Sequence, residues 1–239
     1  MRHIFVGTDP EVFLRDKRTG LFVSAHGMFP GTKDQPYPLD RGALQVDGHA
    51  LEFNTMPVTT EDDFVEVVNH VFGQVKGFVE ATDPNLEIAL EPIAQFDAEY
   101  FAALPEESKE LGCTPDFSAI TGDVLESPAI GNDPIRTGSG HIHVGWTSYE
   151  EAFDTKVFAN RLDVARRLTP YLLEVAKSWE TPESSLRRQY YGRDGAFRPK
   201  HYGVELRALD NLWLRSEESI RAVFRTTVEA FEREYPNAV

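Results

Sequence analysis

The stretch Arg136-Thr-Gly-Ser-Gly-His-Ile-His-Val-Gly145 has the pattern of a glycine-flanked β-strand. Side chains alternate between the two faces of a strand, so His141 and His143 point to the same face. Ile142 and Val144 point to the other face, which is apolar and suited to packing against helices. The glycines leave room for another backbone or a ligand to approach closely. The stretch therefore predicts a strand that lines a binding site; the alternative is a half-buried strand whose histidines face solvent.

Composition indicates a single globular domain over residues 1–239. Apolar residues make up 41% of the chain and charged residues 26%, ordinary values for a globular protein with a sizeable core. No apolar run approaches the roughly 20 residues of a membrane span, and the N-terminus lacks the apolar core of a secretory signal. The single cysteine, Cys113, excludes an intrachain disulfide framework and favours the cytoplasm. The oligomeric state is left open.

The chain is strongly acidic, with a formal net charge of −15. This charge argues against a nucleic-acid partner, because binding to phosphates requires a basic face. It also fits a site built from carboxylates around divalent cations, although most of the 39 acids must be solvated surface.

Two further strand-like segments carry carboxylates in the same alternating way. In residues 3–15, Asp9 and Glu11 share one face, where two carboxylates can converge on a hard cation. Asp47-Gly48 is a hairpin-turn signal, and Glu52 lies on the polar face of the strand after it. In each segment, a solvated polar surface is the alternative to a metal site.

Cations are concentrated near the C-terminal end, between residues 187 and 213. Guanidinium groups bind phosphate and carboxylate bidentately, so this segment predicts a site for polyphosphate or carboxylates; scattered solubilising charge is the alternative. Glu205 and Arg207 share one face of an alternating strand, which places a metal-binding group beside a phosphate-binding one. The cations of this segment are Arg187, Arg188, Arg193, Arg198, Lys200 and Arg207.

Helical spacing predicts a long amphipathic helix over residues 60–81, a second one or a pair of helices over residues 148–178, and a last one after Ser216. Thr60 and Ser216 are expected to cap their helices, with acidic residues in the first turn. Pro170 is expected to kink or interrupt the second helix. Strands and helices together predict an α+β protein.

Four strand motifs present ionisable side chains, and in chain order they are Asp9-x-Glu11, Glu52, His141-x-His143 and Glu205-x-Arg207. This order resembles the carboxylate–amine ligase superfamily, which includes glutamine synthetase and glutamate–cysteine ligase. Three longer stretches look more like its phage-associated COOH-NH2 ligase group, the type 2 amidoligases: Gly7-Thr-Asp-Pro-Glu-Val-Phe13, Gly138-Ser-Gly-His-Ile-His-Val-Gly145 and Tyr202-Gly-Val-Glu-Leu-Arg207. The resemblance spans roughly residues 4–213.

The resemblance implies a curved antiparallel β-sheet like the glutamine synthetase catalytic domain, with helices on its outer face and ATP with Mg²⁺ or Mn²⁺ in the hollow. The metal ligands that it implies are Asp9, Glu11, Glu52, His141 and Glu205. The implied phosphate contacts, both catalytic and cofactor-binding, are His143, Arg198 and Arg207, with Arg193 as a further cofactor contact. Arg136 is assigned to a substrate carboxylate by its position alone.

The activity implied is ATP-dependent formation of an amide or peptide bond through an acyl phosphate, from small-molecule or peptide carboxylate and amine substrates. The location would be the host cytoplasm if the chain is phage-encoded. A metal-dependent hydrolase is one alternative, because His-x-His with scattered acids could hold zinc. A catalytically silent ligand-binding domain is another. Consumption of ATP that needs both an acid and an amine distinguishes the ligase from both.

Overall fold

The structure, a computed structural model, describes residues 4–109, 116–126, 133–146 and 155–236. Cys113 and residues 148–154 of the predicted second helix lie outside these ranges. The strands are β1 (Phe5–Asp16), β2 (Phe22–Val23), β3 (Tyr37–Leu39), β4 (Gly42–Asp47), β5 (Ala50–Thr55), β6 (Leu86–Ala89), β7 (Ile93–Gln95), β8 (Asp116–Ser118), β9 (Val124–Leu125), β10 (Ile135–Thr137), β11 (Gly140–Gly145), β12 (Ala196–Lys200) and β13 (Gly203–Leu206). The helices are α1 (Glu61–Thr82), α2 (Ala98–Ala103), α3 (Glu106–Lys109), α4 (Thr155–Ala176), α5 (Pro182–Tyr190) and α6 (Glu217–Glu234), with 3₁₀ turns η1 (Arg193–Gly195) and η2 (Asn211–Arg215).

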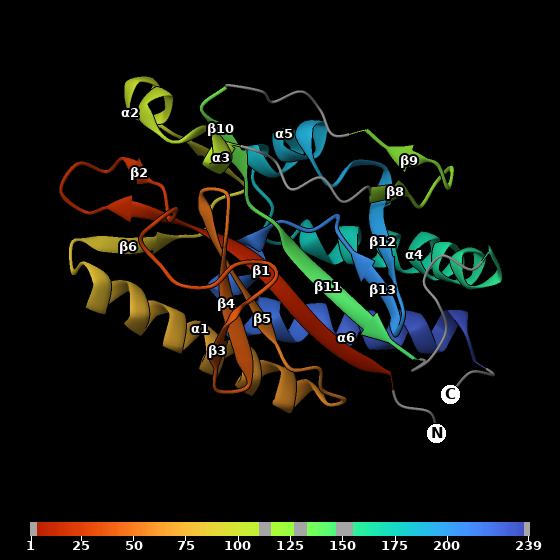
Figure 1. The fold of residues 1–239 in the computed structure, drawn as a ribbon. Helices are drawn as coiled ribbons and strands as arrows, with labels where there is room; N and C mark the ends of the chain where they lie inside the picture. The colour runs from red at the N-terminus through yellow and green to blue at the C-terminus, as the bar shows by residue number, and fades with distance from the viewer. Residues whose placement is uncertain (1–3, 110–115, 127–132, 147–154, 237–239) are drawn as a thin grey trace.

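One large antiparallel sheet organises the chain, which confirms the α+β class (Figure 1). Its main path runs β3-β4-β5-β1-β11-β13-β12-β8-β9, and β2 and β6 also pair with β1. The long strand β1 changes partner along its length: it pairs with β11 over residues 5–10, with β5 at residues 11–12 and with β6 over residues 13–16. Segments distant in sequence therefore meet across β1.

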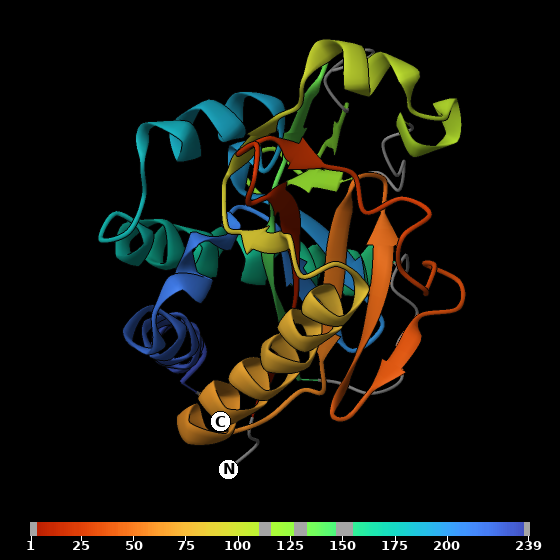
Figure 2. The same cartoon turned by 90° about the vertical axis from the view of Figure 1, so that its left-hand side faces the viewer.

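The three long helices lie on one side of the sheet (Figures 1 and 2). Helix α1 packs on β4, β5 and β6, α4 packs on β12 and β13, and α6 lies between α1 and α4. The core beneath them includes Val71 of α1, Phe53 of β5, Ile142 and Val144 of β11, and Val223 of α6. The apolar faces predicted for the strands thus face the helices, and the ionisable faces point away from them.

Helix boundaries follow the predicted signals closely. Thr60 caps α1 by accepting a hydrogen bond from the Asp63 amide, and Ser216 caps α6 in the same way from Ser219. Pro170 was expected to kink or interrupt its helix; an interruption is wrong, because α4 continues through Pro170 to Ala176, whereas the kink stays a prediction. Pro170 lies on the exposed side of α4, while Leu168, Thr169 and Leu172 are buried, and the packing of this buried side stabilises the helix through the proline.

The predicted strand from Arg136 to Gly145 is divided into two. Strand β10 pairs with β7 in a separate two-stranded sheet, whereas β11 lies in the large sheet. The division falls at Gly138 and Ser139. A Cβ atom at Gly140 would lie 2.2 Å from the Asp210 carbonyl oxygen and 2.3 Å from Trp213 Nε1, so only glycine fits where β11 begins.

None of the helices in the described part of the chain combines the length and the apolar character needed to cross a membrane.

Candidate functional site

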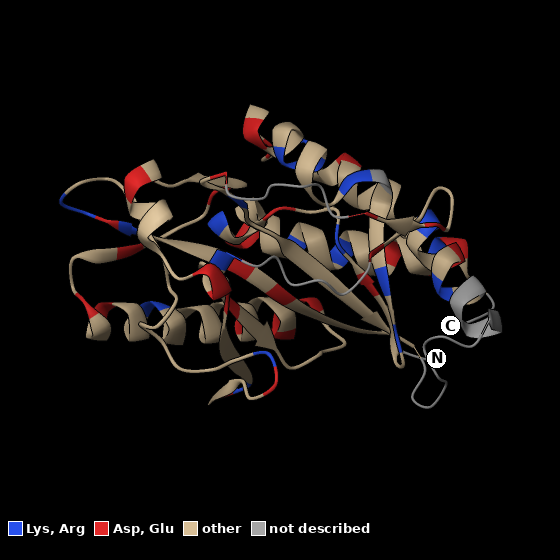
Figure 3. Cartoon of the chain, turned by 45° about the horizontal axis from the view of Figure 1, so that its top comes forward, with Lys and Arg blue, Asp and Glu red and all other residues tan. Residues whose placement is uncertain are grey.

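Strand register brings the predicted side chains into one row across the sheet. Asp9 of β1 is opposite His141 of β11. His143 of β11 is opposite Glu205 of β13, and Glu205 is opposite Arg198 of β12. Residues directly opposite on one face are close enough to interact, so four strands contribute to one site. Figure 3 shows acidic and basic segments next to each other on the central strands.

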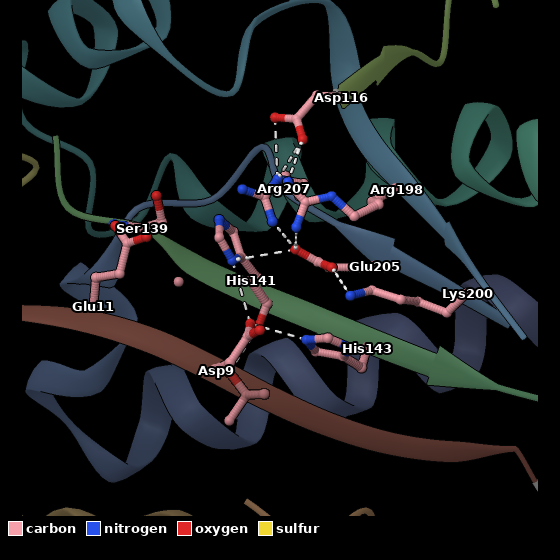
Figure 4. A network of polar contacts seen from close by, with 12 residues as sticks. Asp9, Glu11, Asp116, Ser139, His141, His143, Arg198, Lys200, Glu205 and Arg207 are labelled. Atoms are coloured by element: carbon pink, nitrogen blue, oxygen red, sulfur yellow. Dashed lines mark hydrogen bonds and ion pairs between the residues drawn. The ribbon is translucent and has the colours of Figure 1, made fainter. Parts of the chain in front are cut away.

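The histidine cluster comprises Asp9, His141, His143 and Glu205. Asp9 Oδ1 lies 3.2 Å from His141 Nδ1 and 2.9 Å from His143 Nε2, and Glu205 Oε1 lies 3.5 Å from His141 Nδ1 (Figure 4). Asp9, His143 and Glu205 each offer one ligand atom, and these atoms lie within 4.8 Å of one another. Both histidines therefore reach the acids, whereas the resemblance implied a metal role for His141 alone.

Burial and neighbouring charge set the protonation of this cluster. Burial alone would raise the pKa of Asp9, but the His143 charge and the nearby His141 ring hold it well below its usual value. Burial would lower the pKa of His143, but the Asp9 charge raises it, so Asp9 and His143 favour an ion pair. Burial and the Arg207 charge lower the pKa of His141 to about 4. His141 is therefore neutral at pH 7, the form that binds metal ions.

Several buried atoms of the histidine cluster lack a partner at hydrogen-bond geometry among the described residues, although all of them except His141 Nε2 lie within ion-pair distance of a charged neighbour. They are Asp9 Oδ1, His141 Nδ1 and Nε2, His143 Nε2, and Glu205 Oε1 and Oε2. Buried polar atoms without such partners are rare in folded proteins and require a reason. A cation among these oxygen and nitrogen atoms would satisfy them, so the donor set fits a divalent metal ion. Mg²⁺ suits the carboxylates, and the imidazoles favour Mn²⁺.

A second group, the acidic cluster, comprises Glu11, Asp47 and Glu52. One carboxylate oxygen of each lies within 4.8 Å of the others. Burial and then the Asp47 charge raise the pKa of Glu11 to about 7. Burial and then the charges of Asp9 and Glu11 raise the pKa of Glu52 well above its usual value. Carboxylates forced together in this way hold protons unless a cation replaces them, so this cluster also fits a divalent metal ion.

Asp47 was predicted only as part of a hairpin turn, and the turn between β4 and β5 is confirmed. Its role in the acidic cluster could have been found from alternation. Gln45 is opposite Glu52, and Asp47 follows Gln45 by two residues on the same face of β4. The side chain of Glu11 is oriented by the Ser139 amide, which donates a hydrogen bond to Glu11 Oε2 at 3.0 Å.

Next to the histidine cluster lies the arginine pair, Arg198 and Arg207. Glu205 contacts Arg207 Nη1 directly, lies 3.7 Å from Arg198 Nη1 and lies 2.6 Å from Lys200 Nζ (Figure 4). On the other side, Asp116 accepts from both arginines. Sequence reasoning missed Asp116, because its strand has only three residues and is too short for alternation to be recognised.

The structure does not bring two predicted site residues into this row. Arg193 opens η1, and its Nη2 donates to the Glu126 carbonyl at 3.2 Å. Arg136 lies in the small β7–β10 sheet, where its guanidinium donates to the carbonyls of Lys109, Asp133 and Ile135. Three backbone carbonyls use the donors that a substrate carboxylate would need.

A cleft of about 720 Å³ borders the histidine cluster. Asp9 and His143 line it together with apolar and aromatic groups that include Phe5, Trp146 and Tyr202. The Tyr202 hydroxyl contacts His143 Nδ1, which fixes the orientation of that ring. The volume falls within the range of small-molecule sites.

The row thus contains Asp9, Glu11, Glu52, His141, His143, Arg198, Glu205 and Arg207 from the predicted set. Lys200, one of the cations predicted between residues 187 and 213, joins them at Glu205. Asp47 and Asp116 are additional members that the structure contributes. The chain matched no model of a protein family, and a search of curated proteins found no match either.

Proposed function

We propose that the protein is an ATP-dependent carboxylate–amine ligase that forms an amide or peptide bond through an acyl phosphate. One observation carries this proposal: the histidine cluster, the acidic cluster and the arginine pair lie on one face of one sheet, and Asp9 and His143 of the histidine cluster line a cleft. The clusters are close enough for the charges of Asp9 and Glu205 to raise the pKa of Glu52. Transfer of a phosphoryl group needs this combination of divalent cations and guanidinium groups.

The proposal extends to the fold. We infer that the sheet corresponds to the curved sheet of the glutamine synthetase catalytic domain, and that the chain is related to the type 2 amidoligases. The order of the motifs along the chain supports this inference. The helix layer on the opposite side of the sheet supports it too.

The metal ions of the proposal are Mg²⁺ or Mn²⁺. Asp9, Glu205 and an imidazole would hold one ion, and the acidic cluster would hold another. When bound, such ions neutralise phosphate oxygens and so lower the barrier to phosphoryl transfer. The observation of this chain that supports their presence is the convergence of one ligand atom each from Asp9, His143 and Glu205, all within 4.8 Å of one another.

The other groups then take defined roles. The aromatic and apolar walls of the cleft receive the nucleoside of ATP, with its phosphates directed toward Asp9 and His143. Arg198 and Arg207 stabilise the charge on the phosphoryl group as it moves. A carboxylate oxygen of the acid substrate attacks the γ-phosphorus, and ADP leaves. The amine nitrogen then attacks the acyl carbon, inorganic phosphate leaves, and the amine loses a proton.

The test is release of ADP from ATP and Mg²⁺ in the presence of pooled amino acids and small peptides. The ligase predicts ADP release only when both an acid and an amine are present, with one amide formed per ADP. Turnover of an amide or ester without ATP would instead support a metal-dependent hydrolase. ATP binding without any turnover would support a silent ligand-binding domain.

A further inference from the structure

Asp116 is a nearly buried carboxylate that the proposed reaction does not use, although it contacts both members of the arginine pair. We propose that Asp116 is a positioning residue, which holds Arg198 and Arg207 in place beside the bound metal and so orients the guanidinium group of Arg207 toward the phosphoryl group. This inference rests on the proposed function, and it concerns a residue that would touch neither the substrate nor the metal.

The geometry places Asp116 and Glu205 on opposite sides of the arginine pair (Figure 4). Arg207 Nε lies 3.0 Å from Asp116 Oδ1 and 3.1 Å from Oδ2, and Arg198 Nη2 lies 3.0 Å from Oδ1. Glu205 contacts the Nη1 atoms of the same two arginines. One carboxylate thus orients both guanidinium groups from the side away from the histidine cluster.

Strand register explains why Asp116 lies beside Arg198. Ala196 of β12 is opposite Ser118 of β8, and Phe197 is opposite Phe117. Continued by one residue, this antiparallel register places Asp116 beside Arg198. Asp116 is 9% exposed and Arg207 is 7% exposed, so water competes little for their contact.

The charge balance shows why a second carboxylate is needed. Glu205 faces three cations, Arg198, Lys200 and Arg207, and it also belongs to the metal-ligand set. A divalent ion on Glu205 would repel the guanidinium groups and weaken their hold on that carboxylate. Asp116 belongs to neither cluster of metal ligands, so its attraction for both arginines would remain.

The aromatic ring of Tyr191 also restrains Arg207, because the guanidinium carbon lies 5.2 Å from its centroid. Arg207 is therefore fixed at its Nε edge by Asp116, at Nη1 by Glu205 and over one face by Tyr191. In the proposal, the second Nη group of Arg207 is the donor directed toward a phosphate. Groups that orient a site from behind typically contribute about 10- to 100-fold to affinity or activity.

The test compares Asp116→Asn with the wild type by calorimetric titration of ATP, ADP and adenosine in Mg²⁺, together with kcat and KM. We expect Asp116→Asn to weaken ATP binding by about 10- to 100-fold, to leave adenosine binding unchanged and to lower kcat. Asp116→Glu keeps the charge and should recover part of the loss. It also carries the test if the amide variant fails to fold.

Asp163→Asn is the matched control. Asp163 holds Arg167 Nε at 3.0 Å through both of its oxygens, but on helix α4, away from the site. This control should change neither ATP binding nor kcat. In an Arg198→Gln and Arg207→Gln double background, Asp116→Asn should have little further effect on ATP binding, because a positioning residue acts through its partners.

The outcomes separate this inference from the proposed function. If the wild type binds and consumes ATP but Asp116→Asn binds it equally well or more tightly, Asp116 does not position the arginines and the ligase proposal stands. An equal loss of adenosine binding would show a general structural defect and would also overturn the inference. If the wild type neither binds nor consumes ATP, the ligase proposal fails and this inference fails with it.

Discussion

His141 and His49 are two buried histidines with similar pKa values in different surroundings. Burial lowers the pKa of each to about 4. His49 lies under α2, where Nδ1 is 2.8 Å from Ser24 Oγ and the ring packs against Phe96 and Phe101. His141 lies instead among the carboxylates of the histidine cluster. A lowered pKa therefore reports burial, and only the neighbouring acids distinguish a metal site from an interior histidine.

Arg136, near His49, and Arg207, near His141, also differ in the groups that they contact. Arg136, near His49, donates to three backbone carbonyls and stacks on Phe101, with Cζ 4.7 Å from the ring centroid. Arg207, near His141, is balanced by the carboxylates of Asp116 and Glu205. Backbone partners cannot be exchanged without unfolding, whereas carboxylate partners can be shared with a metal or a phosphate. The contacts of the first region are those of a folded interior, whereas the charged contacts of the second fit the binding role proposed for it.

The largest effect expected from this comparison is on turnover. Glu205→Gln removes the charge shared by the metal site and the arginine pair while keeping the shape of the side chain. We expect kcat to fall by about 10²- to 10³-fold. The measurement is ADP release, with circular dichroism to verify the fold. Glu229→Gln, an exposed acid on α6, is the matched control and should leave turnover unchanged. Near-normal turnover of Glu205→Gln would remove the strongest metal assignment.

The second prediction concerns His49 and pH. Its pKa of about 4 in the folded chain lies below the ordinary value of 6.5. Below pH 6.5 the unfolded chain therefore binds a proton that the folded chain does not, and stability falls as the pH falls toward 4. Between pH 7 and pH 4.5, the wild type should lose about 2 to 3 kcal/mol more of its free energy of unfolding than His49→Asn loses. The measurement is urea unfolding at the two pH values. Equal losses would show that His49 titrates normally in the folded chain.

The third prediction separates stability from activity at Arg136. Arg136→Gln removes most of the donors to the three carbonyls, and unsatisfied buried groups cost about 1 to 3 kcal/mol. We expect the free energy of unfolding to fall by that amount while kcat/KM stays within about 2-fold. The measurements are denaturant unfolding and steady-state kinetics with the acid substrate varied. A large rise in KM for the acid with unchanged stability would restore the carboxylate-binding role predicted from the sequence.

Much of the site was predictable because side-chain alternation is a local property of a strand. That Asp9 and Glu11 share one face of their strand, and that His141 and His143 share one face of theirs, can be predicted without knowledge of the rest of the fold. Asp116 was not predictable, because its partners lie on strands about 80 to 90 residues later and only the register brings them together.

Two predictions were wrong because tertiary contacts, which a local pattern does not show, decided the structure. The sequence from Arg136 to Gly145 alternates as one strand, but its two ends join different sheets. Pro170 was expected to interrupt α4, but helix continuity there depends on packing against the sheet rather than on local propensity. The finer resemblance to glutamine synthetase depends on motif order and stays a prediction.

Binding of Mn²⁺ tests the central claim most directly, because it requires no knowledge of the acid or the amine. Electron paramagnetic resonance measures free Mn²⁺ as protein is added, with and without ATP. We predict saturable binding that ATP strengthens. Glu205→Gln should lose the site of the histidine cluster, and Glu52→Gln should lose the site of the acidic cluster. Absence of saturable binding, or full binding in the Glu52→Gln and Glu205→Gln double variant, would contradict the assignment of these clusters as metal sites.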